Sequence, residues 1–490
     1  MKNATIRGMA ACLSCCLLLP GPAAWATCGG GGGGGTGGMR SGSAGGSAPD
    51  EQVYAVPWKL MKPEDAPVKE GLILYWFPSS ADEFRNSSLR YSRMLSLYAS
   101  QCITLGVADS RTPFAGRLSE NTVLPVAVLA EPNGTAVVRL ENTKGRLKVG
   151  DVEKMVETEV KKRESALKEK LNSGKNKAKA ADNPGAIEEL RAVAGQKCLF
   201  PKLAKDAAKE LKKLGVTDVA EVFHGPAPAL DRARSAKIDQ VMRRGLRAEN
   251  KEKYDEAERL YTEAHRMDPA DPTPLRYIGE VQRHHTGDWV AARATFEKVL
   301  AMPADPLSRA VALHGLGKMT IHDGEFKKGL RLMERAAEEY PLALTYRNLA
   351  VYWNSEREFA KADEYVKLAL ALEPADPYNL VFAAVFTADK GGAQTAEALR
   401  IARKHEGLLS ASYNLAGIYA QAGQREKALK LLRRHFYQYE RYHAVREKEM
   451  MEARVDEVFV SLRHDPEFLD LTRHADGKLP IPAGPMTMRP

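Results

Sequence analysis

Cysteine is scarce in this chain. Only six cysteines occur, and three of them lie within the first 16 residues, which leaves Cys28, Cys102 and Cys198. Small domains that depend on disulfides need a dense, even set of cysteines, so the sequence excludes that class. A single bridge between Cys102 and Cys198 is left open by the sequence.

Long apolar runs are missing from the chain after its first 20 residues. No later stretch approaches the roughly 20 apolar residues that a transmembrane helix needs. The one early apolar run, Met9–Leu19, follows Lys2 and Arg7 and precedes the small-residue site Ala24-Trp25-Ala26. This layout is typical of a secretory signal peptide over residues 1–26, so the sequence predicts an exported bacterial protein of the periplasm or cell envelope.

Cys28 offers a second interpretation of the amino terminus. Cleavage after Ala26 leaves Cys28 close to the new terminus, where a lipoprotein would be acylated. Trp25, three residues before Cys28, argues against this lipid anchor. We therefore expect neither a transmembrane nor a lipid anchor, with lipidation of Cys28 kept as the alternative.

Metal-ligand and nucleic-acid patterns are also absent. His284-His285 has no cysteine or carboxylate at convincing ligand spacing, so we expect it on a helix surface and expect no metal or cofactor. The formal net charge of +9 is concentrated in residues 161–180 and 201–215, which carry +6 and +3. No pattern of a nucleic-acid module accompanies them, so solvated lysine-rich helices are expected. Contact with an anionic lipid or polymer is the second interpretation.

Composition divides the remaining chain. Residues 27–50 form a glycine-rich linker, with Gly29–Gly35 unbroken, and have almost nothing to bury. Residues 51–170 have a mixed pattern of strands and helices, 171–232 form a helical connector, and 233–439 are repetitive. Residues 440–475 are expected to be a helix that caps the last repeat.

The mixed region contains four apolar runs that predict strands, at 71–77, 103–107, 126–130 and 135–140. A helix is expected over 87–100, and a charged helix is expected to open at Asp151 as its N-cap. The resulting order, βαβ and then ββα, resembles the thioredoxin fold. Leu124-Pro125, directly before a strand, matches the cis-proline of that family, so the resemblance implies that Pro125 faces the peptide-gripping site.

The family's redox motif is missing, however. Where thioredoxins carry Cys-x-x-Cys, this chain has Ser80 and Glu83, which cannot perform thiol–disulfide exchange. Cys102 lies between a predicted helix and strand with no basic neighbour to lower its pKa, so we expect it in the core. The resemblance therefore implies a thioredoxin-like domain without the family's chemistry.

Residues 171–185, rich in Asn, Gly and Ser, predict a break or loop. Two helices are expected after it, over 186–194 and 202–214, with Pro201 at the start of the second and Gly215 at its end.

The repetitive region carries a pattern with a period of about 34 residues. Small residues, large apolar residues and a closing proline recur in six near-phase copies, which resembles the tetratricopeptide repeat (TPR). The clearest positions are Gly245, Ala257, Tyr261, Gly279, Ala292, Phe296, Leu349, Ala350, Ala362, Leu415, Ala416 and Tyr419. We expect the large aromatic residues, including Trp289 and Trp353, to fill the layers between repeats.

The resemblance implies a multidomain protein, an α/β thioredoxin-like domain followed by an all-α TPR solenoid. Such a solenoid binds a peptide or protein partner in its groove, and Arg347, Asn348 and Asn414 are the candidate binding residues on the first helices of repeats. The sequence thus predicts an exported, non-catalytic scaffold with no cofactor. The alternative is an oxidoreductase or peroxide-handling enzyme that uses a lone cysteine while the repeats recruit its substrate.

Overall fold

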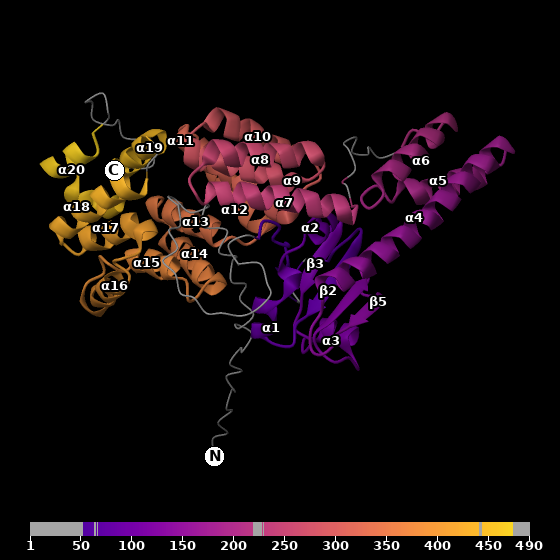
Figure 1. Ribbon diagram of the computed structural model, residues 1–490, viewed down its shortest axis with the longest axis horizontal. Coiled ribbons are helices and arrows are strands. Elements are labelled where there is room, and N and C mark those ends of the chain that lie inside the picture. Colours follow the sequence, from indigo (N-terminus) through magenta and orange to yellow (C-terminus); the bar gives the residue numbers. More distant parts are fainter. Residues whose placement is uncertain are drawn as a thin grey trace, which may run out of the picture.

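The computed structural model describes residues 52–473, apart from 63, 64, 66, 219–227, 229, 441 and 442. The expected signal peptide, the glycine-rich linker and Cys28 lie outside the described residues. Within them, a small mixed sheet is followed by a helical region (Figure 1).

The sheet has five strands in the order β1-β3-β2-β4-β5. Its strands are β1 (Lys59–Leu60), β2 (Leu72–Phe77), β3 (Ile103–Val107), β4 (Val126–Ala130) and β5 (Ala136–Glu141). Strand β3 is parallel to β1 and β2, whereas β4 is antiparallel to both β2 and β5. The four strands expected from the apolar runs are confirmed.

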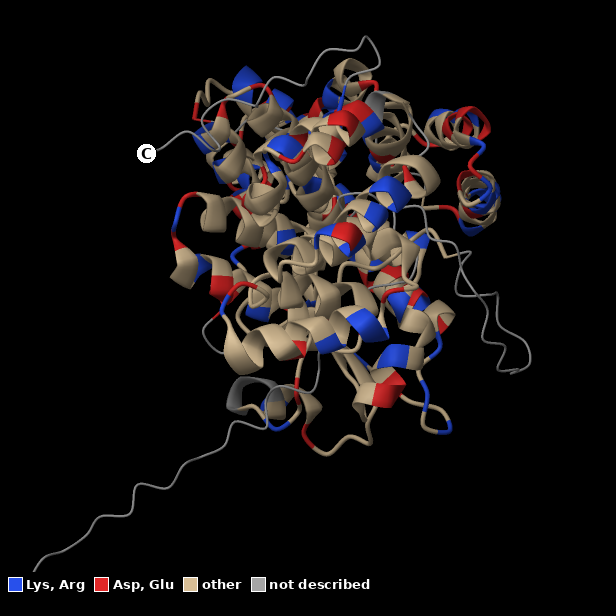
Figure 2. Cartoon of the chain, turned by 90° about the vertical axis from the view of Figure 1, so that its left-hand side faces the viewer, with Lys and Arg blue, Asp and Glu red and all other residues tan. Residues whose placement is uncertain are grey.

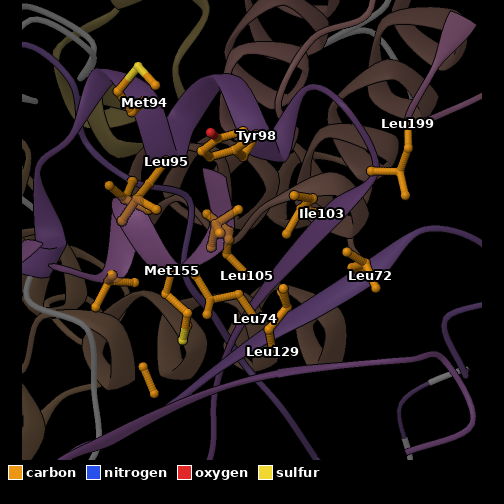
Figure 3. Close-up of a cluster of buried hydrophobic side chains, with 14 of the residues drawn as sticks. Leu72, Leu74, Met94, Leu95, Tyr98, Ile103, Leu105, Leu129, Met155 and Leu199 are labelled. Carbon is orange, nitrogen blue, oxygen red and sulfur yellow. The ribbon is translucent and has the colours of Figure 1, made fainter. Parts of the chain in front are cut away.

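Every residue of β2 is buried because both faces of the sheet are covered. Leu72, Leu74 and Trp76 belong to one apolar cluster, and Ile73 and Tyr75 belong to another on the opposite face. Figure 3 shows the first cluster, where side chains from β2, β3, β4 and neighbouring helices converge. This double burial explains why β2 reads as a continuous apolar run instead of an alternating one.

Short helices connect the strands: α1 (Ala81–Asn86), the 3-10 turn η3 (Ser88–Arg90), α2 (Arg93–Ala99) and α3 (Pro113–Ser119). The single helix expected over 87–100 is wrong. It is interrupted at Tyr91, which bridges to Ala55, and restarts because the Ser92 side chain accepts a hydrogen bond from the Leu95 amide.

Three further helices pack beside the sheet, namely α4 (Val149–Lys179), α5 (Asn183–Ala194) and α6 (Pro201–Lys213). Helix α4 starts before Asp151 and has Lys148 at its N-cap, so the expected N-cap is wrong. The break expected to begin at residue 171 is also wrong, because α4 continues through Gly174. A Cβ there would lie 2.9 Å from Leu190 Cγ, so this glycine allows α5 to approach closely. Pro201 does start α6, and Gly215 has a positive φ just beyond its end.

Helices α5 and α6 share a core with the sheet. Leu190 on α5 and Leu203 and Leu211 on α6 belong to the same buried cluster as Leu72 and Leu74. Many lysines of these helices are paired along the helix or with its neighbours, as in Lys168–Glu164, Lys177–Glu189 and Lys213–Glu210. Figure 2 shows basic and acidic residues interspersed over the helices in that view.

The remaining described residues, from 230 to 473, form helices and the turns between them. The elements are α7 (Arg232–Glu249), α8 (Tyr254–Met267), α9 (Pro272–Glu280), the π-helical turn η4 (Val281–Thr286), α10 (Trp289–Ala301), α11 (Pro306–His322), α12 (Phe326–Glu339), α13 (Ala343–Ser355), α14 (Phe359–Leu372), α15 (Pro377–Val385), α16 (Gly392–Lys404), the 3-10 turn η5 (Leu409–Ala411), α17 (Ser412–Gln421), α18 (Arg425–Arg434), the π-helical turn η6 (His435–Tyr439), α19 (His443–Val455), the 3-10 turn η7 (Glu457–Leu462) and α20 (Pro466–Leu471).

Asp-Pro pairs start four of these helices. Asp271, Asp305, Asp376 and Asp465 are the N-caps of α9, α11, α15 and α20, and each accepts a hydrogen bond from a backbone amide of the first turn. A proline follows at the first helical position, where no intrahelical amide bond is lost. The helix starts are therefore encoded locally.

Neighbouring helices approach closely at small residues. A Cβ on Gly245 would overlap the Tyr261 ring, and a Cβ on Gly279 would overlap the Phe296 ring. Both rings are fully buried, as is Tyr419, in agreement with the expected packing role. Trp289 and Trp353 are only partly buried, but each packs against a buried apolar cluster of the helical region.

Segment 52–58 joins the two parts of the chain. Val53 and Tyr54 belong to the core of α7–α11, whereas Trp58 belongs to the core around the sheet. The Tyr277 hydroxyl donates to the Val53 carbonyl at 3.2 Å. The sheet and the first helices of the helical region are therefore packed against each other.

Candidate functional site

The described residues form a pocket of about 190 Å³ in the helical region. Its walls come from α13, α15 and α17, which are alternate helices in the chain, and from α19 and η7. Apolar side chains such as Val351, Phe382 and Phe386 share these walls with amides and charged groups. A pocket with this mixture can hold apolar groups of a ligand while polar groups orient it.

Arg347, on α13, is fixed in one wall. Its guanidinium lies 4.7 Å from the centre of the Tyr378 ring, and it donates a hydrogen bond to the Asn379 side-chain oxygen. Asn379 is itself buried and donates to a carboxylate oxygen of Glu373 at 3.1 Å. Burial raises the pKa of the Tyr378 phenol, so Tyr378 stays neutral at physiological pH.

Asn348 lies one residue further along α13. Its amide nitrogen is 3.2 Å from His314 Nε2, and His314 Nδ1 is 3.1 Å from Thr345 Oγ1. Burial, followed by the nearby positive charges of Arg283 and Lys318, holds the pKa of His314 well below its usual range. A neutral ring accepts from Asn348 at Nε2 and donates to Thr345 from Nδ1.

Asn414, on α17, completes the group. It lines the same pocket and forms a side-chain hydrogen bond with Tyr378. The structure thus brings together Arg347, Asn348 and Asn414. Pro125 lies in the other part of the chain, buried directly before β4, and its bond to Leu124 is cis as the resemblance implies.

A row of carboxylates on the C-terminal elements forms the opposite wall. The Glu449 carboxylate lies 2.9 Å from His435, and that of Glu452 lies 2.5 Å from His322 and 3.5 Å from Lys318. Burial alone would raise the pKa of Glu452, but Lys318 and His322 outweigh it and hold this pKa well below its usual range. Asp456, the next carboxylate, differs because burial raises its pKa to about 6.

These carboxylates were not predicted as site residues. Residues 440–475 were expected to cap the last repeat, and η7 and α20 do pack on α17 and α18. Helix α19 instead reaches back to η4 and α11. The sequence signal for this arrangement was the spacing of Glu449 and Glu452, which places both on one face of α19, whereas Asp456 follows the end of that helix.

The sheet domain contains no thiol at the redox-motif position. The Ser80 hydroxyl accepts a hydrogen bond from the Glu83 amide at 3.0 Å and so caps α1. Burial raises the pKa of Glu83. Cys102 is not a buried core thiol as expected, because it is partly exposed and forms a disulfide with Cys198.

His284-His285 is buried in the π-helical turn η4, so its expected place on a helix surface is wrong. His285 stacks on Tyr254 with ring centres 4.1 Å apart, and burial lowers its pKa to about 4. Among the described residues, no group of three or more His, Cys, Asp or Glu side chains could hold a metal ion. No helix in the described part of the chain is both long and apolar enough to cross a membrane.

No family model matches this chain, and no curated protein matches it either.

Proposed function

We propose that the chain is an exported, non-catalytic scaffold whose helical region is a TPR solenoid that binds a peptide or protein segment in the pocket between α13, α15 and α17. The observation that carries the proposal is the convergence of Arg347, Asn348 and Asn414 on one pocket with apolar walls. Amide and guanidinium groups can bond a peptide backbone, while Val351 and Phe382 accept apolar side chains.

Packing supports the TPR interpretation. The repeat signature places small residues where helices cross, and Gly245 and Gly279 are the positions at which a Cβ would overlap Tyr261 and Phe296. The sheet order and the cis bond before Pro125 likewise support a thioredoxin-like first domain. That domain is proposed to be inert in redox chemistry because Ser80 caps a helix where the family has a thiol.

The Cys102–Cys198 disulfide supports export. Disulfides persist in oxidising compartments such as the bacterial periplasm and are rare in the cytosol. The same bond argues against the alternative enzyme, because a lone nucleophilic thiol is not present when Cys102 is paired. An insulin-reduction assay of the wild-type chain and the Cys102→Ser variant tests this point. Activity that depends on Cys102 would contradict the non-catalytic proposal.

Capture of partners from an envelope extract tests the binding proposal. Val351→Glu places a charge among the apolar walls of the pocket, and Leu368→Glu makes a comparable change on α14, outside the pocket. The two side chains are 38% and 37% exposed, so the substitutions are matched. We expect the wild-type chain and Leu368→Glu to retain one specific partner that Val351→Glu loses. Equal capture by all three proteins would contradict the proposal.

A further inference from the structure

Helix α19 lies against parts of the helical region that are distant from it in sequence. Figure 1 shows α19 beside α11, although more than a hundred residues separate them in the chain. Lys448 Nζ is 3.5 Å from the centre of the Trp289 ring and 3.4 Å from the Gly287 carbonyl oxygen. Helix α19 therefore spans from the start of α10 to the pocket.

The contact face of α19 is amphipathic. Met450, Ala453 and Val455 are buried, with at most 5% of each exposed. Glu449 and Glu452 flank this apolar strip and meet basic side chains of the helical region. The face is thus an apolar strip bordered by carboxylates.

The receiving surface is complementary in charge. Lys318 and His322 on α11 approach Glu452, and His435 on η6 approaches Glu449. Tyr413 on α17 donates to the Asp456 carboxylate at 3.1 Å. These four groups come from three separate elements, α11, η6 and α17. Together they form a surface that recognises two carboxylates three residues apart on α19, Glu449 and Glu452, and a third, Asp456, directly after its end.

The same residues place this surface next to the candidate binding pocket. Lys318, Tyr413 and His435 line the pocket together with Arg347 and Asn414. A ligand helix that binds along this pocket would therefore compete with α19 for Lys318, Tyr413 and His435.

We infer that the groove formed by this pocket and the adjoining receiving surface binds an amphipathic helix of a partner protein that carries carboxylates on its contact face, and that α19 is the intramolecular occupant of that site. This inference rests on the proposed function and specifies its ligand. A tethered segment acts at an effective concentration in the millimolar range, so α19 weakens binding of a free helix until it is displaced.

The test uses the full chain and a fluorescein-labelled peptide that copies residues 443–456. Glu449→Gln with Glu452→Gln removes both charges from α19 and leaves the receiving surface intact. We expect this double variant to bind the peptide at least tenfold more tightly than the wild-type chain. Glu447→Gln is the matched control, because the carboxylate of Glu447 pairs with His443 on α19 itself, and it should bind like the wild type.

Two further measurements keep the test decisive. Adding Lys318→Gln to the double variant should remove the gain, because the receiving cation is lost. Excess peptide added to the wild-type chain should speed hydrogen exchange in residues 443–455 alone, which does not depend on the double variant being folded. Equal peptide binding by the wild type and a folded double variant, or no faster exchange in α19, would overturn the inference.

The peptide-binding test of α19 and the partner-capture test of the proposed function can fail independently of each other. Partner capture that depends on Val351, combined with no binding of the peptide, would refute the α19 inference and leave the groove function standing. Loss of Val351-dependent capture would refute the groove function itself.

Discussion

Arg93 should hold the sheet and the helical region together. The side chain extends from α2 into the helical region, where Nε donates to Asp271 at 2.9 Å and a terminal nitrogen donates to Asp268. Its other terminal nitrogen donates to the Ser235 hydroxyl at 2.7 Å, and the Tyr54 hydroxyl donates to Asp271 at 2.8 Å. Arg93, Asp268 and Asp271 are each at most 4% exposed. The network is therefore a buried ion cluster at the junction.

Arg93→Met keeps most of the apolar stem and removes the charge. Asp268 and Asp271 then remain buried without their cation, and breaking a buried ion pair in this way costs about 3 to 5 kcal/mol. Burial already raises the pKa of Asp271, and Arg93 opposes that rise. Without Arg93 the pKa of the Asp271 carboxyl in the folded variant rises further. The free energy of unfolding of the variant therefore falls as the pH rises through that pKa. The loss should be larger at pH 8 than at pH 5.

Urea unfolding followed by tryptophan fluorescence measures the effect. Trp58 and Trp76 report on the sheet and Trp289 and Trp353 on the helical region. We expect Arg93→Met to lower the free energy of unfolding by about 3 kcal/mol or more at pH 8 and to separate the transitions of the two parts. Arg111→Met, which removes an exposed ion pair, is the control and should leave the unfolding midpoint nearly unchanged.

Adding Asp271→Asn to Arg93→Met should recover part of the loss, because asparagine is neutral and still caps α9. If Arg93→Met changed the free energy of unfolding by less than about 1 kcal/mol at both pH values, the buried ion cluster would not be what holds the two parts together.

Three other predictions concern the core and the disulfide. Gly279→Leu should lower the free energy of unfolding by more than about 2 kcal/mol, because the new side chain displaces the buried Phe296 ring. Urea denaturation measures this free energy. A variant as stable as the wild type would contradict the close approach of the two helices at Gly279. Burial raises the pKa of Glu249 from 4.5 to about 7, so stability is lost as pH rises between these values. Glu249→Gln should therefore be more stable than the wild type by about 3 kcal/mol at pH 8 and nearly equal in stability at pH 4.5. A stability difference between the two proteins that does not change with pH would contradict this assignment. The Cys102–Cys198 bond closes a loop with a sequence separation of 96, so Cys198→Ser should lower the free energy of unfolding by about 2 to 4 kcal/mol under oxidising conditions. Thermal unfolding of the variant should show no further loss of stability when reductant is added.

Features encoded by neighbouring residues were predictable from the sequence. Strands β2 and β4 are short apolar runs that are buried along their whole length. Asp-Pro pairs mark four helix starts through local capping. The repeat period placed Arg347, Asn348 and Asn414 on alternate helices, and these residues do line one pocket.

Features that depend on distant contacts were missed. Gly174 looked like a helix breaker, but its close approach to Leu190 on α5 favours a continuous helix. His284-His285 looked exposed because its burial comes from a π-helical turn and from Tyr254 on another helix. The carboxylate wall depends on α19 folding back to α11, which no local pattern predicts.

Site-specific photo-crosslinking shows whether a partner protein binds in the pocket between α13, α15 and α17. A benzoylphenylalanine placed at Val351 in the full chain samples the pocket, and the same group at Leu368 samples α14 outside it with equal exposure. We expect one dominant protein adduct in cells from position 351, reduced when Asn414→Lys is added, and none from position 368. Identical adducts from both positions, or none from position 351 in a folded chain, would contradict this expectation.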